Sequence, residues 1–218
     1  MRAVRFRNAG GPETLTVEEV PDPVGGINDV VINVAGAGLN RADSLQRQGR
    51  YNLPADASDI FGMEVSGTVD AVGSAVSGFR PGDTVMALLH SGGYSERVVA
   101  PSGHVLSVPA NIDLLDAAGL PEAAATLVSN LCLAGRFQPG ETVLIHGATG
   151  GIGAFGIQLV KALGGRVAVT ASSDSKLLRA QQLGADFLIN YQTEDFAQRL
   201  LNEGGADIIL DTVGGSYL

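Results

Sequence analysis

The sequence predicts an α/β fold, in which an N-terminal β-rich domain rolled like a barrel precedes part of a Rossmann fold with a doubly wound parallel sheet. Three observations support this prediction. Residues 1–120 contain short apolar runs separated by glycine and proline turn signals. From residue 121 onward, strand-like and helix-like segments alternate. Residues 142–153 read TVLIHGATGGIG, which is a short strand, a glycine-rich turn and the start of a helix.

The N-terminal part is expected to be mostly β. Its predicted strands lie at 3–6, 15–19, 30–37, 64–72, 84–87, 94–100 and 105–107. Residues 41–48 predict one short helix that ends at Gly49, a residue type common just after helices. Irregular strand spacing and many glycines favour a rolled, barrel-like arrangement over a simple meander.

The pattern changes near Pro121. A proline in the first turn and an acid, Glu122, near the positive end of the dipole predict a helix that continues to residue 134 and stops at Gly135. Strands are then expected at 142–146, 166–170, 187–190 and 207–211, with helices up to 163, around 176–183 and around 195–201. Strands joined by helices of this length imply a parallel sheet with right-handed crossovers. The expected domains are therefore 1–120 and 121–218.

The glycine-rich turn is the main chemical motif. A G-x-G-x-x-G fingerprint read from position 148 keeps its second and third glycines but has alanine in place of the first. Its residues are Ala148, Thr149, Gly150, Gly151, Ile152 and Gly153. Backbone N–H groups at such a helix start bind pyrophosphate, and a Cβ would hold the backbone away from the ligand. The alternative is a glycine-rich turn in an ordinary βαβ unit.

Composition excludes several classes of protein. The net charge is −9, so the chain lacks the excess of basic residues that nucleic-acid-binding proteins carry. The single cysteine, Cys132, rules out an intrachain disulfide framework and a cysteine-rich zinc site. The N-terminus has no apolar segment typical of a secretory signal, and no apolar run is expected to reach the length of a membrane span. A cytoplasmic protein without membrane partners is therefore expected.

Several stretches together resemble the medium-chain dehydrogenase/reductase superfamily, and specifically its zinc-free quinone oxidoreductase (zeta-crystallin-like) branch. They are GGPETL (10–15), LNRADSLQRQGRY (39–51), FGMEVSGTVDAVG (61–73), PGDTVMAL (81–88), GGYSERVV (92–99), LPEAAAT (120–126) and PGETVLIHGATGGIG (139–153). The resemblance covers the whole chain. It implies a GroES-like catalytic domain over 1–120, an NADPH-binding Rossmann domain over 121–218, and an active site in the cleft between them.

The resemblance also indicates which metal chemistry is missing. The zinc alcohol dehydrogenases carry a zinc-binding cysteine where this chain has Asn40, and a zinc-binding histidine where it has Met63. A catalytic zinc needs three protein ligands, and an amide and a thioether cannot replace thiolate and imidazole. No metal site is therefore expected.

The resemblance implies a set of cofactor-binding residues. Lys176 and Tyr191 match the pair that holds the 2′-phosphate of NADPH in this branch, and Thr126 matches a threonine near the nicotinamide. The position where NAD enzymes place a ribose-binding acid falls on Ser172, which is not acidic. A cation and a phenol suit a phosphate dianion, so NADPH is the expected cofactor. The alternatives are a solvated lysine, an interfacial tyrosine and an ordinary helical threonine.

The substrate side is expected to involve Asn40 and Tyr51, which line the substrate cleft in family members and are the candidate catalytic residues. Asn40 could instead cap the helix beginning near Arg41, and Tyr51 could simply cover a loop. Glu64 is expected to be a buried carboxylate with an unknown partner. Gln46 is expected on a solvated helix face, and His146 behind the phosphate turn.

The resemblance implies NADPH-dependent reduction of a quinone by hydride transfer. The alternatives are reduction of an enoyl thioester or an enone, and a non-catalytic NADPH-binding protein. Family members continue beyond position 218 and are commonly homodimers. This sequence is therefore expected to be a C-terminally truncated form that is weakly stable, prone to aggregate through its last strand, and poorly active.

Overall fold

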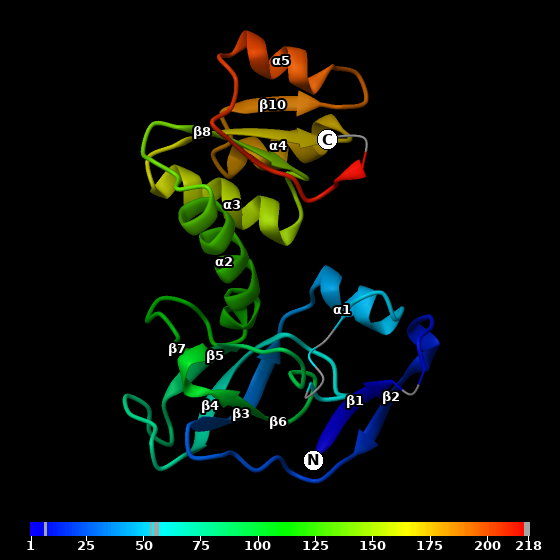
Figure 1. The fold of residues 1–218 in the computed structure, drawn as a ribbon, viewed down its shortest axis with the longest axis vertical. Coiled ribbons are helices and arrows are strands. Elements are labelled where there is room, and N and C mark those ends of the chain that lie inside the picture. Colours follow the sequence, from blue (N-terminus) through cyan, green and yellow to red (C-terminus); the bar gives the residue numbers. More distant parts are fainter. Residues whose placement is uncertain (7, 53, 55–56, 216–218) are drawn as a thin grey trace. The chain divides into compact units, whose positions relative to one another are not determined.

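The computed structural model describes residues 1–218 except 7, 53, 55–56 and 216–218. Two compact units make up the chain, Met1–Glu122 and Ala123–Leu218 (Figure 1). Each unit has its own hydrophobic core.

The first unit is built on two antiparallel sheets. A two-stranded sheet pairs β1 (Arg2–Phe6) with β2 (Leu15–Glu19). A five-stranded sheet has the order β6-β3-β4-β5-β7, formed by β3 (Asp29–Ala37), β4 (Glu64–Val72), β5 (Thr84–Leu88), β6 (Arg97–Pro101) and β7 (Val105–Ser107). Two register shifts in the β3–β4 pairing increase the local bend of the sheet. The curled, β-rich architecture predicted for this part of the chain is confirmed.

Alternating residues of the five-stranded sheet form the core of the first unit. They include Val30 and Ile32 of β3, Val65 and Val69 of β4, and Val85 of β5, each 2% exposed or less. β-branched side chains pack well on a pleated surface, which explains why these runs form strands.

The short elements of this unit differ most from the prediction. Helix α1 (Arg41–Arg47) was expected, but the 3₁₀ turns Pro12–Thr14, Ser102–His104 and Asp116–Gly119 were not, because three or four residues are too few to show a helical period. The prediction of strand from residue 94 was also wrong, since β6 begins at Arg97. The Tyr94 N–H instead donates to the carbonyl of Phe61 at 2.7 Å.

Helix α2 (Pro121–Leu127) begins at the expected proline and continues as a π-helix over Val128–Ala134. The sequence predicted one uniform helix here. In the structure, the Ser129 hydroxyl donates to the carbonyl of Ala125 at 2.6 Å, and the Asn130 amide donates to the carbonyl of Thr126 at 2.8 Å. Side-chain bonds of this kind compete with the regular helical ladder and accompany changes of winding.

The helical stretch Asp116–Ala134 corrects the expectation about membrane-spanning length. It is 19 residues long and apolar enough, by length and composition, to cross a membrane, whereas no run of that length was expected from the sequence. It is the one such stretch among the residues that the structure describes. The core helix of a soluble protein meets the same criteria.

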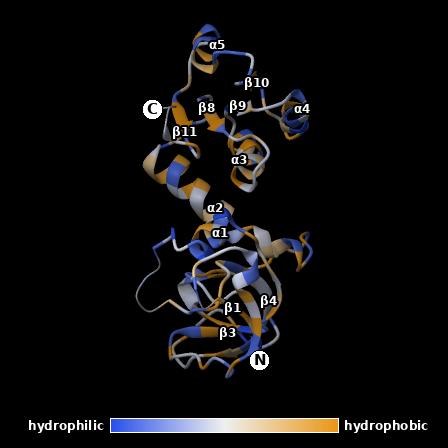
Figure 2. Cartoon of the chain, turned by 90° about the vertical axis from the view of Figure 1, so that its right-hand side faces the viewer, coloured by the Kyte–Doolittle hydropathy of each residue, from blue (hydrophilic) through white to orange (hydrophobic). Residues whose placement is uncertain are grey.

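The second unit contains a four-stranded parallel sheet with the order β10-β9-β8-β11. Its strands are β8 (Thr142–His146), β9 (Arg166–Ala171), β10 (Phe187–Asn190) and β11 (Ile208–Leu210), joined through α3 (Gly151–Ala162), α4 (Asp174–Gln182) and α5 (Phe196–Asn202). This order corresponds to 3-2-1-4 of the Rossmann fold. In Figure 2, β8 and β11 are hydrophobic, whereas α4 is mostly hydrophilic.

Helices cover both faces of this sheet. Val143 and Ile145 of β8 share one core cluster with Ile157 of α3 and Leu177 of α4. Leu144, between them in the strand, belongs to a second cluster that includes Leu200 of α5. Because successive side chains point to opposite faces, strands buried on both sides read as continuous apolar runs. The predicted doubly wound sheet is confirmed.

Candidate functional site

The glycine-rich turn joins β8 to α3. Ala148 is 1% exposed, and its N–H donates to the carbonyl of Thr170 in β9 at 3.1 Å, which holds the turn against the sheet. Around Gly151, by contrast, no atom beyond its chain neighbours and the nearby backbone of its own helix lies within 4 Å of the position of a Cβ. The N–H groups of a first helical turn have no partner within the helix. The turn therefore presents several of them at an open surface, which suits the phosphates of a dinucleotide.

Gly153 closes this turn tightly. A Cβ at this position would collide with the carbonyl oxygen of Gly147 and would lie 2.8 Å from the carbonyl carbon of Ala148. Both neighbours are backbone atoms, so the turn itself would have to shift. The other members of the motif complete the loop, with Thr149 and Ile152 half-buried and Gly150 exposed.

Gly153→Ala is expected to lower the free energy of unfolding by about 1–3 kcal/mol, the usual cost of overpacking. Denaturant titration measures this loss. Gly151→Ala is the matched comparison for stability, because it adds the same methyl group where no neighbour lies within 4 Å. Equal stability of the two variants would show that the Gly153 contact does not constrain the turn.

Three predicted cofactor-binding residues follow the ends of the neighbouring strands. Ser172 comes directly after β9, and Tyr191 directly after β10, where its N–H donates to the carbonyl of Ala171 at 3.2 Å. Lys176 lies in the first turn of α4, and its Nζ donates to the Ser172 hydroxyl at 3.0 Å. Carboxyl ends of parallel strands share one edge, so these residues lie along the same edge as the phosphate turn. Lys176 and Tyr191 are both exposed.

Thr126 comes from a different element, the helix before the sheet. It lies in α2, is half-buried, and its carbonyl accepts the hydrogen bond from Asn130.

Asn40 occupies the N-cap position of α1, as the alternative interpretation of this residue expected. Its Nδ2 also reaches across to β4 and donates to Oε1 of Glu64 at 2.9 Å. The other Glu64 oxygen, Oε2, accepts the main-chain N–H of Glu122 at 2.9 Å. The partners of the buried Glu64 carboxylate, which the sequence could not identify, are thus an amide side chain and a backbone N–H. Tyr51 follows α1 and is 38% exposed.

A second buried carboxylate adjoins this group. Asp43 Oδ2 accepts the Asn40 N–H at 2.7 Å and the Tyr94 hydroxyl at 2.8 Å. Burial, and then the hydrogen bond to Asp43, raises the pKa of the Tyr94 hydroxyl, so it stays protonated as the donor. No site role for Asp43 or Tyr94 was predicted from the sequence. The N-x-x-D spacing of Asn40 and Asp43 at a helix start was the available signal.

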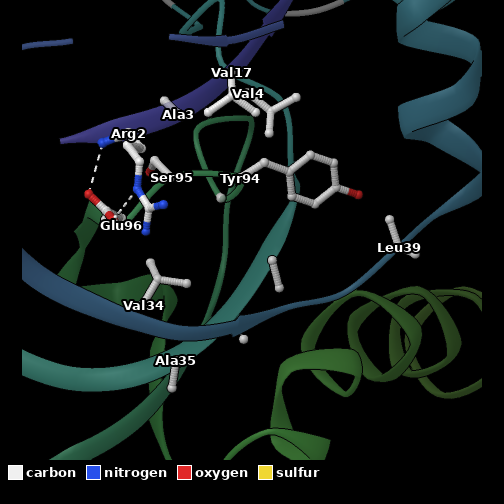
Figure 3. Close-up of a pocket in the computed structure, with 13 residues that line it drawn as sticks. Arg2, Ala3, Val4, Val17, Val34, Ala35, Leu39, Tyr94, Ser95 and Glu96 are labelled. Carbon is white, nitrogen blue, oxygen red and sulfur yellow. Dashed lines mark hydrogen bonds and ion pairs between the residues drawn. The ribbon is translucent and has the colours of Figure 1, made fainter. Parts of the chain in front are cut away.

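Among the pockets of this unit, two include Tyr94 in their lining. One of about 350 Å³ is lined by Asn40, Asp43, Tyr94 and Phe61, among others. A second, of about 510 Å³, has apolar walls that include Val4 and Val17, an Arg2–Glu96 ion pair and Tyr94 (Figure 3). None of the sequence-predicted site residues is among the described residues that line the second pocket.

Two further expectations concern buried polar residues. His146 is 2% exposed, its Nδ1 lies 2.9 Å from the Thr170 hydroxyl, and burial lowers its pKa. Its ring meets Phe196 edge-on, so it fills space at the end of β8, as expected. The expectation for Gln46 was wrong, because its side chain is 3% exposed. Gln46 lies one helical turn after the buried Asp43 and shares its inward face.

Among the described residues, no three histidine, cysteine, aspartate or glutamate side chains gather where they could hold a metal ion. Met63, which the family resemblance matches to a zinc-binding histidine, is half-buried beside Glu64.

Comparison with known proteins agrees with this architecture. Residues 26–110 match the alcohol dehydrogenase GroES-like domain, and residues 151–218 match the zinc-binding dehydrogenase family. The quinone oxidoreductase of Sus scrofa is 33% identical over 227 residues, which covers all of this chain and 68% of that protein. The chain belongs to the medium-chain dehydrogenase/reductase superfamily.

Solved structures of the medium-chain dehydrogenases/reductases superimpose closely on this member. The Escherichia coli quinone oxidoreductase complexed with NADPH gives a TM-score of 0.89 at 30% identity, covering 99% of this chain and 67% of that one. The CurK enoyl reductase gives 0.88 at 30% identity, covering 99% and 68%. Among curated animal relatives, the chain spans from 39% to 68% of their length.

Proposed function

We propose that this chain is an NADPH-dependent oxidoreductase that reduces a quinone without using zinc. The observation that carries the proposal is the cluster of Ser172, Lys176 and Tyr191 along the same sheet edge as the glycine-rich turn. An enzyme built for NADH would place an acid at the position of Ser172, where it would repel a 2′-phosphate.

Each part of this edge has a role in holding the cofactor. The N–H groups around Gly150–Gly153 bind the pyrophosphate. Lys176 and Tyr191 bind the 2′-phosphate, and the Ser172 hydroxyl orients the Lys176 ammonium group at 3.0 Å. Thr126 contacts the nicotinamide end, as in the family. These residues select NADPH and fix its orientation.

The reaction transfers two electrons and two protons in total. When bound, NADPH supplies a hydride, and one further proton from water or a side chain completes the conversion of quinone to hydroquinone. Asn40 and Tyr51 orient the substrate. Zinc independence follows from Asn40 and Met63, because neither side chain can replace the thiolate and imidazole of a catalytic zinc site.

The partners and setting follow from this activity. The substrate is a small molecule, the expected compartment is the cytoplasm, and homodimerisation is expected for the longer family form. An acidic net charge of −9 argues against a nucleic-acid partner.

A second candidate is an NADPH-dependent reductase of enoyl thioesters or enones. The similarity to the CurK enoyl reductase favours it, since its TM-score of 0.88 nearly equals that of the quinone oxidoreductase. A third candidate, from another class, is a protein that binds NADPH without catalysis.

One steady-state experiment separates these candidates. NADPH oxidation is measured with ortho-quinones, para-quinones and enoyl thioesters, beside NADPH binding measured by fluorescence. Turnover of quinones is the expected result. Preference for enoyl thioesters would favour the second candidate, and NADPH binding with no turnover would favour the third.

A further inference from the structure

The Glu64 carboxylate accepts hydrogen bonds from two donors, a fixed backbone N–H and a side-chain amide that can rotate. Glu64 is the first residue of β4, and it is 2% exposed. Its Oε2 accepts a hydrogen bond from the main-chain N–H of Glu122, and a main-chain N–H can act only as a donor. Its Oε1 accepts the side-chain amide of Asn40, which presents a donor at one end and an acceptor at the other.

The chain makes room for this arrangement. A Cβ at Gly38 would collide with Oε1 of Glu64, so a larger residue here would displace the carboxylate. The Gly38 N–H also donates to the Glu64 carbonyl at 3.2 Å.

The groups that face Glu64 are acidic or neutral. Asp43 comes from α1, Tyr94 from the segment before β6, and Glu122 from α2. Among the described residues, no cation pairs with Glu64. Burial is the main cause that raises the pKa of Glu64; the hydrogen bonds from Glu122 and Asn40 oppose it, and the charges of Glu122 and Asp43 add to it.

We propose that Glu64 is a positioning residue that decides which end of the Asn40 amide faces the substrate. An ionised carboxylate only accepts hydrogen bonds, so it holds the Asn40 NH₂ group and leaves Oδ1 at the opposite end of the amide. There the Asn40 side chain takes part in a capping box with Asp43 but makes no side-chain cap hydrogen bond. A protonated Glu64 keeps Oε2 as the acceptor for Glu122 and carries its proton on Oε1. That proton is donated to Asn40 Oδ1, and the turned amide presents its NH₂ group.

The two orientations recognise different chemical groups. An outward NH₂ donates to the carbonyl oxygen of a quinone or an enone. An outward Oδ1 accepts from the hydroxyl of a hydroquinone and would repel a carbonyl oxygen. The protonation of Glu64 therefore favours the oxidised substrate over the reduced product. This inference rests on the proposed function, in which Asn40 contacts the substrate.

Glu64→Gln tests the inference because it fixes one orientation. The substituted side chain must turn its amide oxygen to the Glu122 N–H, which leaves its NH₂ group for Asn40 Oδ1, so Asn40 presents NH₂ at every pH. For the unmodified chain, kcat/KM for a para-quinone should fall by up to about tenfold per pH unit above the Glu64 pKa, through KM. This fall in kcat/KM at high pH is the alkaline limb of the pH profile. The Glu64→Gln variant should lack this limb.

Asp70→Asn is the matched control. Asp70 also lies in β4 and accepts an asparagine amide, from Asn33 at 3.0 Å, but it is paired with Arg97 at 3.2 Å. Its replacement should leave the limb in place. A limb that survives Glu64→Gln, or that disappears equally in both variants, would overturn the proposal.

Nuclear magnetic resonance of the unmodified chain gives a readout that does not depend on turnover. The side-chain amide resonances of Asn40 should move with the titration of the Glu64 carboxyl carbon, whereas those of Asn33 should not. Asn40 resonances that stay fixed through that titration would overturn the proposal. Resonances that move in a chain without quinone turnover would support it and count against the proposed quinone reductase function instead.

Discussion

Tyr51→Phe is expected to slow the reduction of an enoyl thioester by about 10²–10⁴-fold, the usual contribution of a positioned acid. Reduction of an alkene needs a proton after the hydride, and the Tyr51 hydroxyl is proposed to give it. The side chain is 38% exposed, so a substrate can reach it. Quinone reduction should change much less, because the hydroquinone anion left by hydride transfer can take its one remaining proton from water.

The comparison of the two substrates decides the role of Tyr51. Rates are measured for both on the same preparation, with NADPH affinity as the control for folding. Equal losses for both substrates would make Tyr51 a positioning residue. No loss with either would show that it covers a loop, as the alternative interpretation holds.

Lys176→Ala is expected to weaken NADPH binding by roughly 10- to 150-fold, which corresponds to about 1.5–3 kcal/mol for one charged hydrogen bond. NADH binding should hardly change, because NADH lacks the 2′-phosphate. Fluorescence titration of both cofactors measures the difference. The loss should shrink at high salt, since Lys176 is exposed.

Lys161→Ala is the matched control for this variant. Lys161 is another lysine of the same unit, and it lies in the last turn of α3, at the end away from the glycine-rich turn. Its Nζ pairs with Asp186 at 2.8 Å. The Lys161→Ala substitution should leave the affinities for NADPH and for NADH unchanged. Equal losses of affinity for NADPH and for NADH in Lys176→Ala would mean that this lysine does not recognise the 2′-phosphate.

The sequence predicted the regular elements well because their signals are local. The boundaries of β2, β4, β8 and β10 agree with the prediction to the residue. For β4 and β8, a glycine directly follows the strand-forming run, at Gly73 and Gly147. The π-helical part of the α2 segment escaped prediction, because helical periodicity does not distinguish the two windings over seven residues.

The candidate sites were less accessible to sequence reasoning. Glycine spacing predicts the phosphate turn, since strand, turn and helix are consecutive. The contact between Asn40 and Glu64 joins residues 24 positions apart, and it depends on Gly38 leaving space. The burial of Gln46 depends on which face of a seven-residue helix turns inward, and so short a helix gives no clear period.

Strand β8 has one consequence for the motions of the second unit. It is paired with β9 on one side and β11 on the other, all five of its residues are buried, and helices cover both faces of its sheet. Opening such a strand requires nearly the whole unit to unfold, so its amide protons should be the last to exchange with solvent. Gly147 follows directly at its end. The proposed phosphate-binding turn is therefore anchored to the slowest-exchanging segment of the unit, while Tyr191, one of the residues proposed to choose between cofactors, follows β10 at the edge of the sheet, where local opening requires less free energy.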